Sequence, residues 1–483
     1  MIKRLLLKKD INSLLSGAFD ESTGLKRALS TFELVSLGVG GIVGAGIFVL
    51  TGNAAAQYAG PAVTLSFLLA LVACGFAGFC YAELASMIPV AGSAYTYAYA
   101  SMGEFIAWII GWDLILEYFL GATTVAIGWS GYVVSFLKDL DITFPRKLSG
   151  PLISYNPTLN SWHLTGNIFN LPAFTIILIV TILLITGIRA SSRANTAIVI
   201  IKVAILLVFI TTGLFYIKPE LWHPFIPPNT GTFGSFGMSG ILRAAGLVFF
   251  AYIGFDSVST AASEAKNPQK SLPVGILGSL AICTLLYISV SLILTGIVHY
   301  SKLGGPAPIA TATDAMGLTF LATLIKIGAI AGLTSVILVL VLGQTRIFYA
   351  MSKDGLLPPM FSLIHKRYRT PHVSTIVVGV AASLASTLLP IDIVSELVSI
   401  GTLLAFFIVC AGVLILKYTR PEIKRIFSVP WGPVIPVGGM ISCLYLMAAL
   451  PSGTWYRLVI WLILGLIVYF TYSIKKSSLN KTT

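Results

Sequence analysis

The sequence predicts an all-α integral membrane protein with twelve transmembrane helices. Only 10% of the 483 residues are Asp, Glu, Lys or Arg, whereas a soluble domain carries about a quarter. Hydrophobic residues make up 56% of the chain, and its mean hydropathy is +0.91. Several apolar stretches reach the roughly 17 to 20 residues that cross the hydrocarbon layer, and the clearest are 171–188, 197–215, 276–298 and 458–474.

The twelve spans are centred near residues 43, 75, 118, 181, 206, 252, 286, 333, 381, 406, 441 and 464. Because twelve is even, both termini lie on one side of the membrane. If that side is the cytoplasm, its segments hold 22 Lys and Arg residues and the opposite side holds 7, as the positive-inside rule expects. We therefore expect a multi-pass protein of the cell (plasma) membrane with cytoplasmic N- and C-termini.

The formal net charge of +13 points to membrane lipids rather than nucleic acid, because the basic residues lie in short loops beside anionic headgroups. The five cysteines all fall inside apolar segments and lack the spacing of a metal site or a disulfide framework. We interpret them as small packing residues. The sequence contains no common catalytic motif, so we expect no enzyme, no cofactor and no metal.

Five glycines fall within nine residues of the first span, from Gly38 to Gly46. Each costs roughly 1 kcal/mol in a helix interior, so a continuous helix is disfavoured there. The sixth span has a matching interruption, where Gly254 is closely followed by Asp256. These spans begin two five-helix halves, and interrupted helices at equivalent positions of an inverted repeat indicate a transporter site.

Such interruptions expose N–H groups at one break and C=O groups at the other. The backbone alone could therefore hold the carboxylate and the ammonium group of an amino acid near the midplane. In the alternative interpretation, Gly40 and Gly44 form a GxxxG packing face and Asp256 merely caps a helix.

Four ionisable residues lie deepest in the predicted spans: Asp256, Lys202, Asp113 and Glu117. Each costs at least about 2.5 kcal/mol there, so each needs a partner or a function. The apolar neighbours of Asp256 favour its neutral form, which would let it take a proton from one side and release it to the other. The alternative is an always-ionised structural cap.

Lys202 lies about seven residues from the predicted cytoplasmic end of its span, or on the order of 10 Å, so its ammonium group could snorkel. Alternatively, it is a fixed charge that replaces a coupling sodium ion by donating to unwound carbonyls of the first span. Asp113 and Glu117 share one helix face. Glu117 could neutralise a lysine across the bundle, act in inner-end gating with Asp113, or pair for structure alone.

Three tyrosines, Tyr95, Tyr97 and Tyr99, follow the second span closely. We place them in a loop and interpret them as interfacial anchors rather than ligands.

Four segments resemble signatures of the amino acid–polyamine–organocation superfamily: GIVGAGIFVLTG (41–52), PVAGSAYTYAY (89–99), FFAYIGFDSVSTAASEAKNPQKSLP (249–273) and GQTRIFYAMSKDGLLP (343–358). They stand in the family's order, and the resemblance covers nearly the whole chain. It is closest to bacterial members of the cationic amino acid transporter family. It implies a LeuT-like fold, with two inverted five-helix repeats, two further helices, and alternating access around a central site.

The resemblance also implies a set of site residues. In similar proteins the interruptions of the first and sixth spans contact the substrate, which carries over to Ile42, Val43, Gly44, Ala45, Gly46, Phe250, Ala251 and Ile253. Asp256 matches the family's proton site, and Lys202 matches the lysine at the sodium position. Relatives often have Ser or Thr where this chain has Ala45, so one hydroxyl for the substrate carboxylate is missing.

The expected domains are a cytoplasmic segment (1–31), the two repeats (32–218 and 219–418), helices 11 and 12 (419–474) and a cytoplasmic tail (475–483).

The expected function is proton-coupled, sodium-independent uptake of small neutral amino acids such as alanine, because no acid besides Asp256 is evident near the two interruptions. Cationic amino-acid uptake or amino-acid exchange is the alternative within transport. From other classes, a receptor without flux or a channel remains open. The expected partners are the amino-acid substrate, protons and membrane lipids, and a small single-span protein or a sterol-like lipid is a further candidate at the outer face.

Overall fold

The computed structural model describes residues 7–9, 29–90, 93–156, 161–186, 192–262, 265–368, 370–423 and 425–481. Most of the predicted cytoplasmic segment 1–31 and the last two residues of the predicted tail therefore lie outside the described residues.

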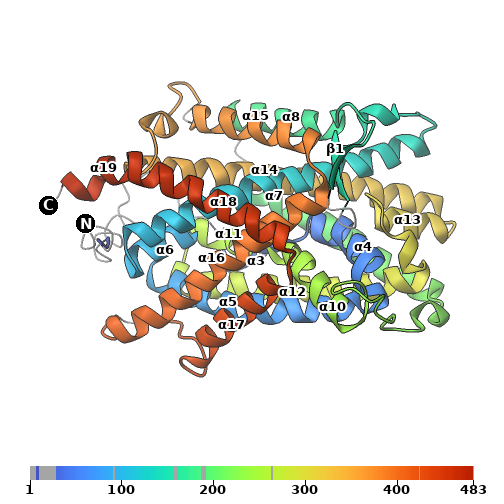
Figure 1. Ribbon diagram of the computed structural model, residues 1–483, viewed down its shortest axis with the longest axis horizontal. Coiled ribbons are helices and arrows are strands. Elements are labelled where there is room, and N and C mark those ends of the chain that lie inside the picture. Colours follow the sequence, from blue (N-terminus) through green and yellow to red (C-terminus); the bar gives the residue numbers. More distant parts are fainter. Residues whose placement is uncertain are drawn as a thin grey trace.

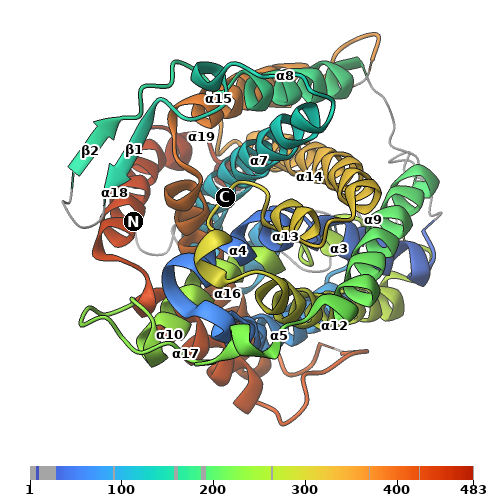
Figure 2. The same cartoon turned by 90° about the vertical axis from the view of Figure 1, so that its right-hand side faces the viewer.

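The described chain is a bundle of helices whose axes run mainly along its longest dimension (Figure 1). Viewed from one end, α3 and α4 lie in the interior, and α8 and α15 lie side by side at the edge (Figure 2). The helices are α3 (Thr31–Ile42), α4 (Thr51–Ala54), α5 (Val63–Met87), α6 (Ser93–Ser101), α7 (Glu104–Asp139), α8 (Leu171–Thr186), α9 (Ser192–Gly213), α10 (Gly237–Val248), α11 (Ser257–Thr260), α12 (Pro268–Ile297), α13 (Pro308–Ala315), α14 (Thr319–Lys353), α15 (His372–Leu388), α16 (Ile391–Thr419), α17 (Val434–Ala449), α18 (Ser452–Val468) and α19 (Ile474–Lys476).

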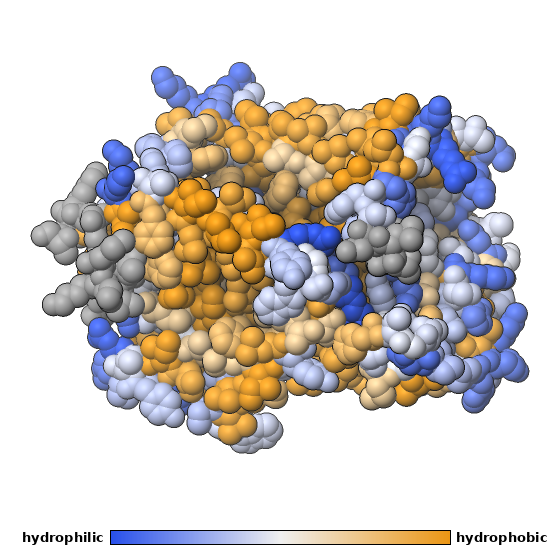
Figure 3. Space-filling view, viewed as in Figure 1, coloured by the Kyte–Doolittle hydropathy of each residue, from blue (hydrophilic) through white to orange (hydrophobic). Residues whose placement is uncertain are grey.

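On the face seen in Figure 3, apolar side chains cover most of the middle of the molecule apart from one hydrophilic cluster, and hydrophilic residues gather toward its two ends. Within the described residues, eight segments are long and apolar enough to cross a membrane: Thr31–Met87, Glu104–Asp139, Thr196–Tyr216, Gly237–Thr260, Pro268–Ile297, Thr319–Lys353, Ile391–Thr419 and Ser452–Lys476. The helices α8, α15 and α17 are shorter but also apolar. The five cysteines are all buried, which confirms them as packing residues.

The prediction of helices alone missed a small β-hairpin between α7 and α8. Its strands β1 (Ile153–Asn156) and β2 (Ser161–Leu164) pair antiparallel. The guanidinium group of Arg457 lies 5.7 Å and 5.8 Å from the ring centres of Tyr155 and Trp162, so cation–π contacts hold the hairpin to α18.

The prediction of an anchor loop after the second span is wrong. Tyr95, Tyr97 and Tyr99 belong to α6 and are buried. Desolvation by burial raises the pKa of Tyr95, which keeps its hydroxyl a neutral donor to Asp354 Oδ2 at 2.6 Å. Helical periodicity was obscured because the segment alternates tyrosine with small residues.

Asp354, just beyond α14, also joins the two ends of the described chain. Lys9 Nζ donates to Asp354 Oδ1 at 2.7 Å, and the Ser478 N–H donates to the Asp354 carbonyl at 2.9 Å. We call the end of the bundle where these three residues meet the Asp354 end.

Candidate functional site

The first predicted interruption is present, and it follows directly from α3. This helix starts with a capping box, in which Ser30 Oγ accepts from the Glu33 N–H and Glu33 Oε2 accepts from the Ser30 N–H. It ends at Ile42, because Val43 has an extended backbone with φ −73° and ψ 91°. Helical structure resumes in the π-helical turn Gly46–Leu50. A GxxxG face on one continuous helix is therefore wrong.

The second predicted interruption follows α10 and a 3₁₀ turn, Phe249–Tyr252. The backbone is extended at Ile253 and reaches φ +119° at Gly254, and α11 starts at Ser257. Only glycine adopts such a positive φ without strain, so Gly254 sets the place of this interruption.

The two interruptions lie directly against each other. A Cβ added to Gly46 would lie 2.3 Å from the Cα of Ala251, and a Cβ added to Gly254 would lie 2.6 Å from the carbonyl carbon of Gly41. Both positions face main-chain atoms, which cannot move aside as a side chain can. The glycines therefore bring into contact two unwound main-chain segments that are far apart in sequence.

Sequence reasoning missed the residue that joins these main chains. The Tyr287 hydroxyl, buried on α12, lies 2.8 Å from the carbonyl oxygen of Ile42 and 2.6 Å from that of Ala251. These carbonyls belong to different interruptions. One hydroxyl has one proton to donate, so the two oxygens share it. An isolated tyrosine in an apolar helix gave no sequence signal for this role.

Lys202 on α9 points into the bundle and is only 1% exposed. Its Nζ donates to the carbonyl of Gly40 at 2.6 Å and to that of Val43 at 2.9 Å. The snorkelling alternative is therefore wrong, because the ammonium group binds carbonyls at the first interruption.

Asp256 lies at the second interruption and is buried. Its Oδ2 accepts from the Tyr118 hydroxyl at 2.9 Å and from Ser93 Oγ at 3.5 Å. Among the described residues, Oδ1 has no partner. Although Asp256 directly precedes α11, its side chain makes no capping hydrogen bond, so the alternative of a structural cap is wrong.

Asp113 and Glu117 are both buried on α7. Asp113 faces α16, where its Oδ1 lies 2.8 Å from the position of a Cβ on Gly401. Neither Asp113 oxygen has a partner in the described part of the chain. No ion pair between described residues includes Glu117, and Lys202 binds the Gly40 and Val43 carbonyls instead.

A small central cavity of about 20 Å³ lies between the two interruptions. Six residues implied by the resemblance line it: Ile42, Gly44, Ala45, Gly46, Phe250 and Ile253. Val43 and Ala251 instead supply carbonyls to Lys202 and Tyr287. Sequence reasoning missed the remaining walls, which are Gly41, Gly121, Val125, Val336 and Leu340. A water molecule needs about 10 to 15 Å³, so this cavity is closed to an amino acid.

The comparison with known proteins decides the family. The amino acid permease family model matches residues 29–470. The chain belongs to the amino acid permease family. The permease is 45% identical to a methylthioribose transporter of Bacillus subtilis over 99% of both chains. It is 45% identical to a branched-chain amino acid permease of the same organism over 98% of both chains.

The permease is also 39% identical to a vacuolar cationic amino acid transporter of Arabidopsis thaliana, over 86% of this chain and 68% of that one. Together with the apolar segments of the fold, these relatives identify a multi-pass membrane permease of the amino acid–polyamine–organocation superfamily. The resemblance drawn from the four sequence motifs is thereby confirmed.

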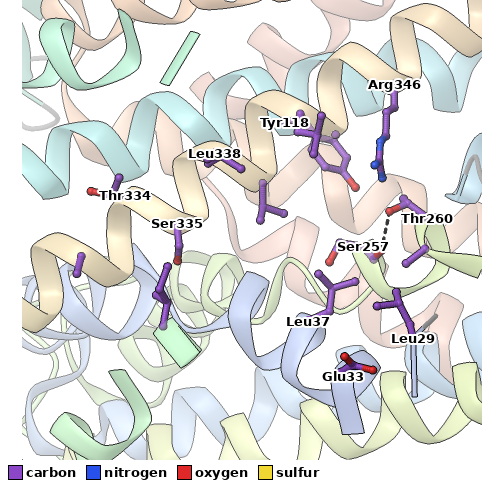
Figure 4. Close-up of a pocket in the computed structure, with 16 residues that line it drawn as sticks. Leu29, Glu33, Leu37, Tyr118, Ser257, Thr260, Thr334, Ser335, Leu338 and Arg346 are labelled. Atoms are coloured by element: carbon purple, nitrogen blue, oxygen red, sulfur yellow. Dashed lines mark hydrogen bonds between the residues drawn. The ribbon is translucent and has the colours of Figure 1, made fainter. Parts of the chain in front are cut away.

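A larger cavity of about 290 Å³ lies between α3, α7, α9, α11 and α14 of the permease. Figure 4 shows Tyr118 extending from α7 past α14 toward Ser257, with Glu33 and Arg346 near the margin of the cavity. The hydroxyl of Tyr118, which lines this cavity, also binds Asp256. Tyr118 therefore connects the larger cavity with the carboxyl group at the second interruption.

Proposed function

We propose that the permease imports neutral amino acids together with protons, without sodium, by alternating access. The observation that carries the proposal is the contact between two interrupted helices, one holding Lys202 and the other holding Asp256. The fixed charge and the exchangeable proton then have separate places at one site.

The substrate backbone would bind main-chain groups of both interruptions. The first N–H groups of a helix have no intrahelical acceptor. The turn Gly46–Leu50, where helical structure resumes, therefore presents donors suited to a carboxylate. The unwound segment from Phe250 to Ile253 would face the substrate ammonium group. Alanine at position 45 supplies no hydroxyl, so these donors must suffice.

The side chain of the substrate would meet apolar walls. Val125, Val336 and Leu340 border the central cavity, and no charged residue lines it within the described chain. A cationic side chain would lose its hydration there without gaining a counter-charge. This favours neutral over cationic substrates, and the similarity to a branched-chain amino acid permease extends the expected range from alanine to leucine, isoleucine and valine.

Sodium independence would follow from Lys202. Its ammonium group already occupies the Gly40 and Val43 carbonyls, which are oxygens of the kind that bind a sodium ion in transporters with half-helices. Proton coupling would follow from Asp256, a buried carboxyl with one oxygen not hydrogen-bonded to any described residue. Tyr118 connects the 290 Å³ cavity with the Asp256 carboxyl group.

We further propose twelve membrane crossings in a LeuT-like arrangement. Thr31–Met87 is long enough for two crossings, and the seven other long segments with the three shorter apolar helices supply the rest. The interruptions lie in the first and sixth crossings, which supports inverted repeats at 32–218 and 219–418. If the Asp354 end lies in the cytoplasm, as the predicted orientation requires, the 290 Å³ cavity faces the cytoplasm.

Uptake by purified permease in liposomes tests this proposal. Labelled alanine or leucine should enter faster when the outside is acidified, at equal rates in sodium and potassium buffers. When all twenty amino acids are tested as competitors, the small and aliphatic ones should inhibit labelled uptake, and arginine and lysine should not. Uptake at a rate independent of the proton gradient would exclude proton symport. Strong inhibition by arginine would favour the alternative of cationic amino-acid uptake.

A second candidate substrate is methylthioribose, because a relative named for its transport is as similar as the branched-chain permease. This sugar has neither a carboxylate nor an ammonium group, so it could not use the main-chain contacts proposed above. Uptake of labelled methylthioribose, without uptake of labelled leucine or alanine, would replace the amino-acid proposal with this one.

A further inference from the structure

An open groove of about 520 Å³ lies on the side of the bundle, away from both cavities of the proposed transport site. It runs between the first turns of α12 and the segment that follows α16. Gln269, Lys270, Val274 and Gly278 form one wall, and Ile426 and Phe427 form the other.

The second wall is held in place by a partly buried ion pair. Glu83 on α5 accepts from Arg425 Nε at 3.0 Å and from the Val429 N–H at 2.7 Å. Between these two attachment points, Phe427 stacks on Phe79 with ring centres 6.4 Å apart. Charge-assisted hydrogen bonds of this kind are strong, so the groove keeps its wall without a ligand.

The opposite wall is hollowed at Gly278. A Cβ at this position would meet only Val35, at 3.5 Å, which is ordinary van der Waals contact. Because Gly278 lines the groove, we expect a larger side chain here to narrow it. The missing side chain therefore leaves room beside α12 for an elongated ligand.

The groove is polar at one end and apolar along its length. Lys270, which lines the groove, is exposed in the first turn of α12, and no described residue forms an ion pair with it. Val274 is 52% exposed on the same face, and Leu285 is 69% exposed. From Lys270 to Leu285 this face extends roughly 22 Å, which exceeds the roughly 15 Å of hydrocarbon in one leaflet.

Exposed aromatic residues place the polar end at the membrane surface. Tyr418 is 71% exposed and Trp431 is 78% exposed, and they flank the segment that forms the second wall. Amphipathic rings gather at the level of the lipid headgroups. On the segment that follows α16, Glu422 is paired with Arg420 at 3.6 Å, and Lys270 supplies the positive charge at the polar end of the groove.

We propose that this groove binds one anionic phospholipid, with its phosphate at Lys270 and Gln269 and an acyl chain along Val274 and Gly278. The cationic end matches the headgroup, and the apolar walls match the chain. A free phosphate ion would use the first feature but not the second. This inference is independent of what the permease transports.

The test is native mass spectrometry of the purified permease with phosphatidylglycerol or phosphatidylcholine of identical acyl chains. Phosphatidylglycerol should bind at least about fivefold more tightly, since a lysine near the surface attracts anionic lipid by roughly that factor. Lys270→Gln should remove the preference, and Gly278→Leu should weaken binding of both lipids. Lys302→Gln, an exposed lysine outside the groove, is the matched control and should keep wild-type binding.

Equal binding of the two lipids by the wild type, or an unchanged preference in Lys270→Gln, would overturn the proposal. Glycerol phosphate at the same concentration should not displace the lipid. Displacement would show a soluble-anion site instead. Because Lys270 is exposed, its substitution should leave folding intact, which the elution volume and alanine uptake of the variant would verify.

Discussion

The interruption after α3 and the interruption after α10 lie against each other, yet their polar groups are satisfied differently. At the first, the Gly40 and Val43 carbonyls both accept from Lys202. At the second, Asp256 is bound through Oδ2 only, and Oδ1 has no partner in the described part of the chain. The comparison separates an ammonium group with two carbonyl partners from a carboxyl group whose bonding is incomplete.

This difference matters because the membrane interior penalises unpaired charge. Lys202 is stable as an ammonium group only while its carbonyls remain near, so we expect it to stay charged through the cycle. Asp256 Oδ1 is free of described partners and could accept a proton, and Tyr118 connects this carboxyl group with the 290 Å³ cavity. In the proposed function, the first interruption would therefore serve as a fixed support, and the second would carry the coupling.

The largest effect is expected from separating the two interruptions. In Gly46→Ala the new methyl group would lie 2.3 Å from the Ala251 main chain, so the backbones must move apart. We expect alanine uptake in proteoliposomes to fall roughly 100-fold, which corresponds to about 2.7 kcal/mol and lies at the upper end of the ~1–3 kcal/mol that overpacking costs. Gly75→Ala, where a methyl group meets nothing within 4 Å, is the control. Similar uptake by the two variants would show that the close contact is unimportant.

Removing the fixed charge should have the next largest effect. Lys202→Met keeps an unbranched apolar chain but leaves two buried carbonyls without a donor, at about 1–3 kcal/mol each. Uptake should fall at least about tenfold, with a lower thermal unfolding midpoint. Lys326→Met is the matched control, because Lys326 is also buried but pairs with Asp139 at 2.8 Å, away from both interruptions. Equal uptake by the two methionine variants would argue against a role for Lys202.

Tyr287→Phe should have an intermediate effect, because it removes the hydroxyl shared by the Ile42 and Ala251 carbonyls. We expect a roughly tenfold loss in kcat/KM for alanine uptake, which corresponds to about 1.4 kcal/mol. The neighbouring Tyr252 donates to the Phe67 carbonyl on α5 instead, so Tyr252→Phe should keep more activity. The reverse order of the two variants would contradict the bridging role.

The smallest effect is expected from adding a donor beside the substrate. Ala45→Ser places a hydroxyl in the wall of the central cavity, where a net hydrogen bond contributes about 0.5–1.5 kcal/mol. The KM for alanine should fall about two- to fivefold while proton coupling stays unchanged. A rise in KM would indicate that the carboxylate binds elsewhere.

The sequence predicted both interruptions because their causes are local. Five glycines within nine residues disfavour a helix, and Gly254 supplies the positive φ that ends the second helix. It also offered the Lys202 carbonyl contact as one of two alternatives, which the structure has decided. Tyr287, Gly121 and Leu340 could not be predicted, because their importance depends on which helix faces meet, and a single sequence carries no record of that packing.

The accumulation of labelled alanine by Asp256→Asn under an inward proton gradient tests the central claim most directly. Asparagine keeps the shape of the side chain but cannot bind or release the proton. We predict that the variant fails to accumulate alanine above the outside concentration yet exchanges internal for external alanine within about threefold of the wild-type rate. Accumulation at the wild-type level would contradict the assignment of proton coupling to the second interruption.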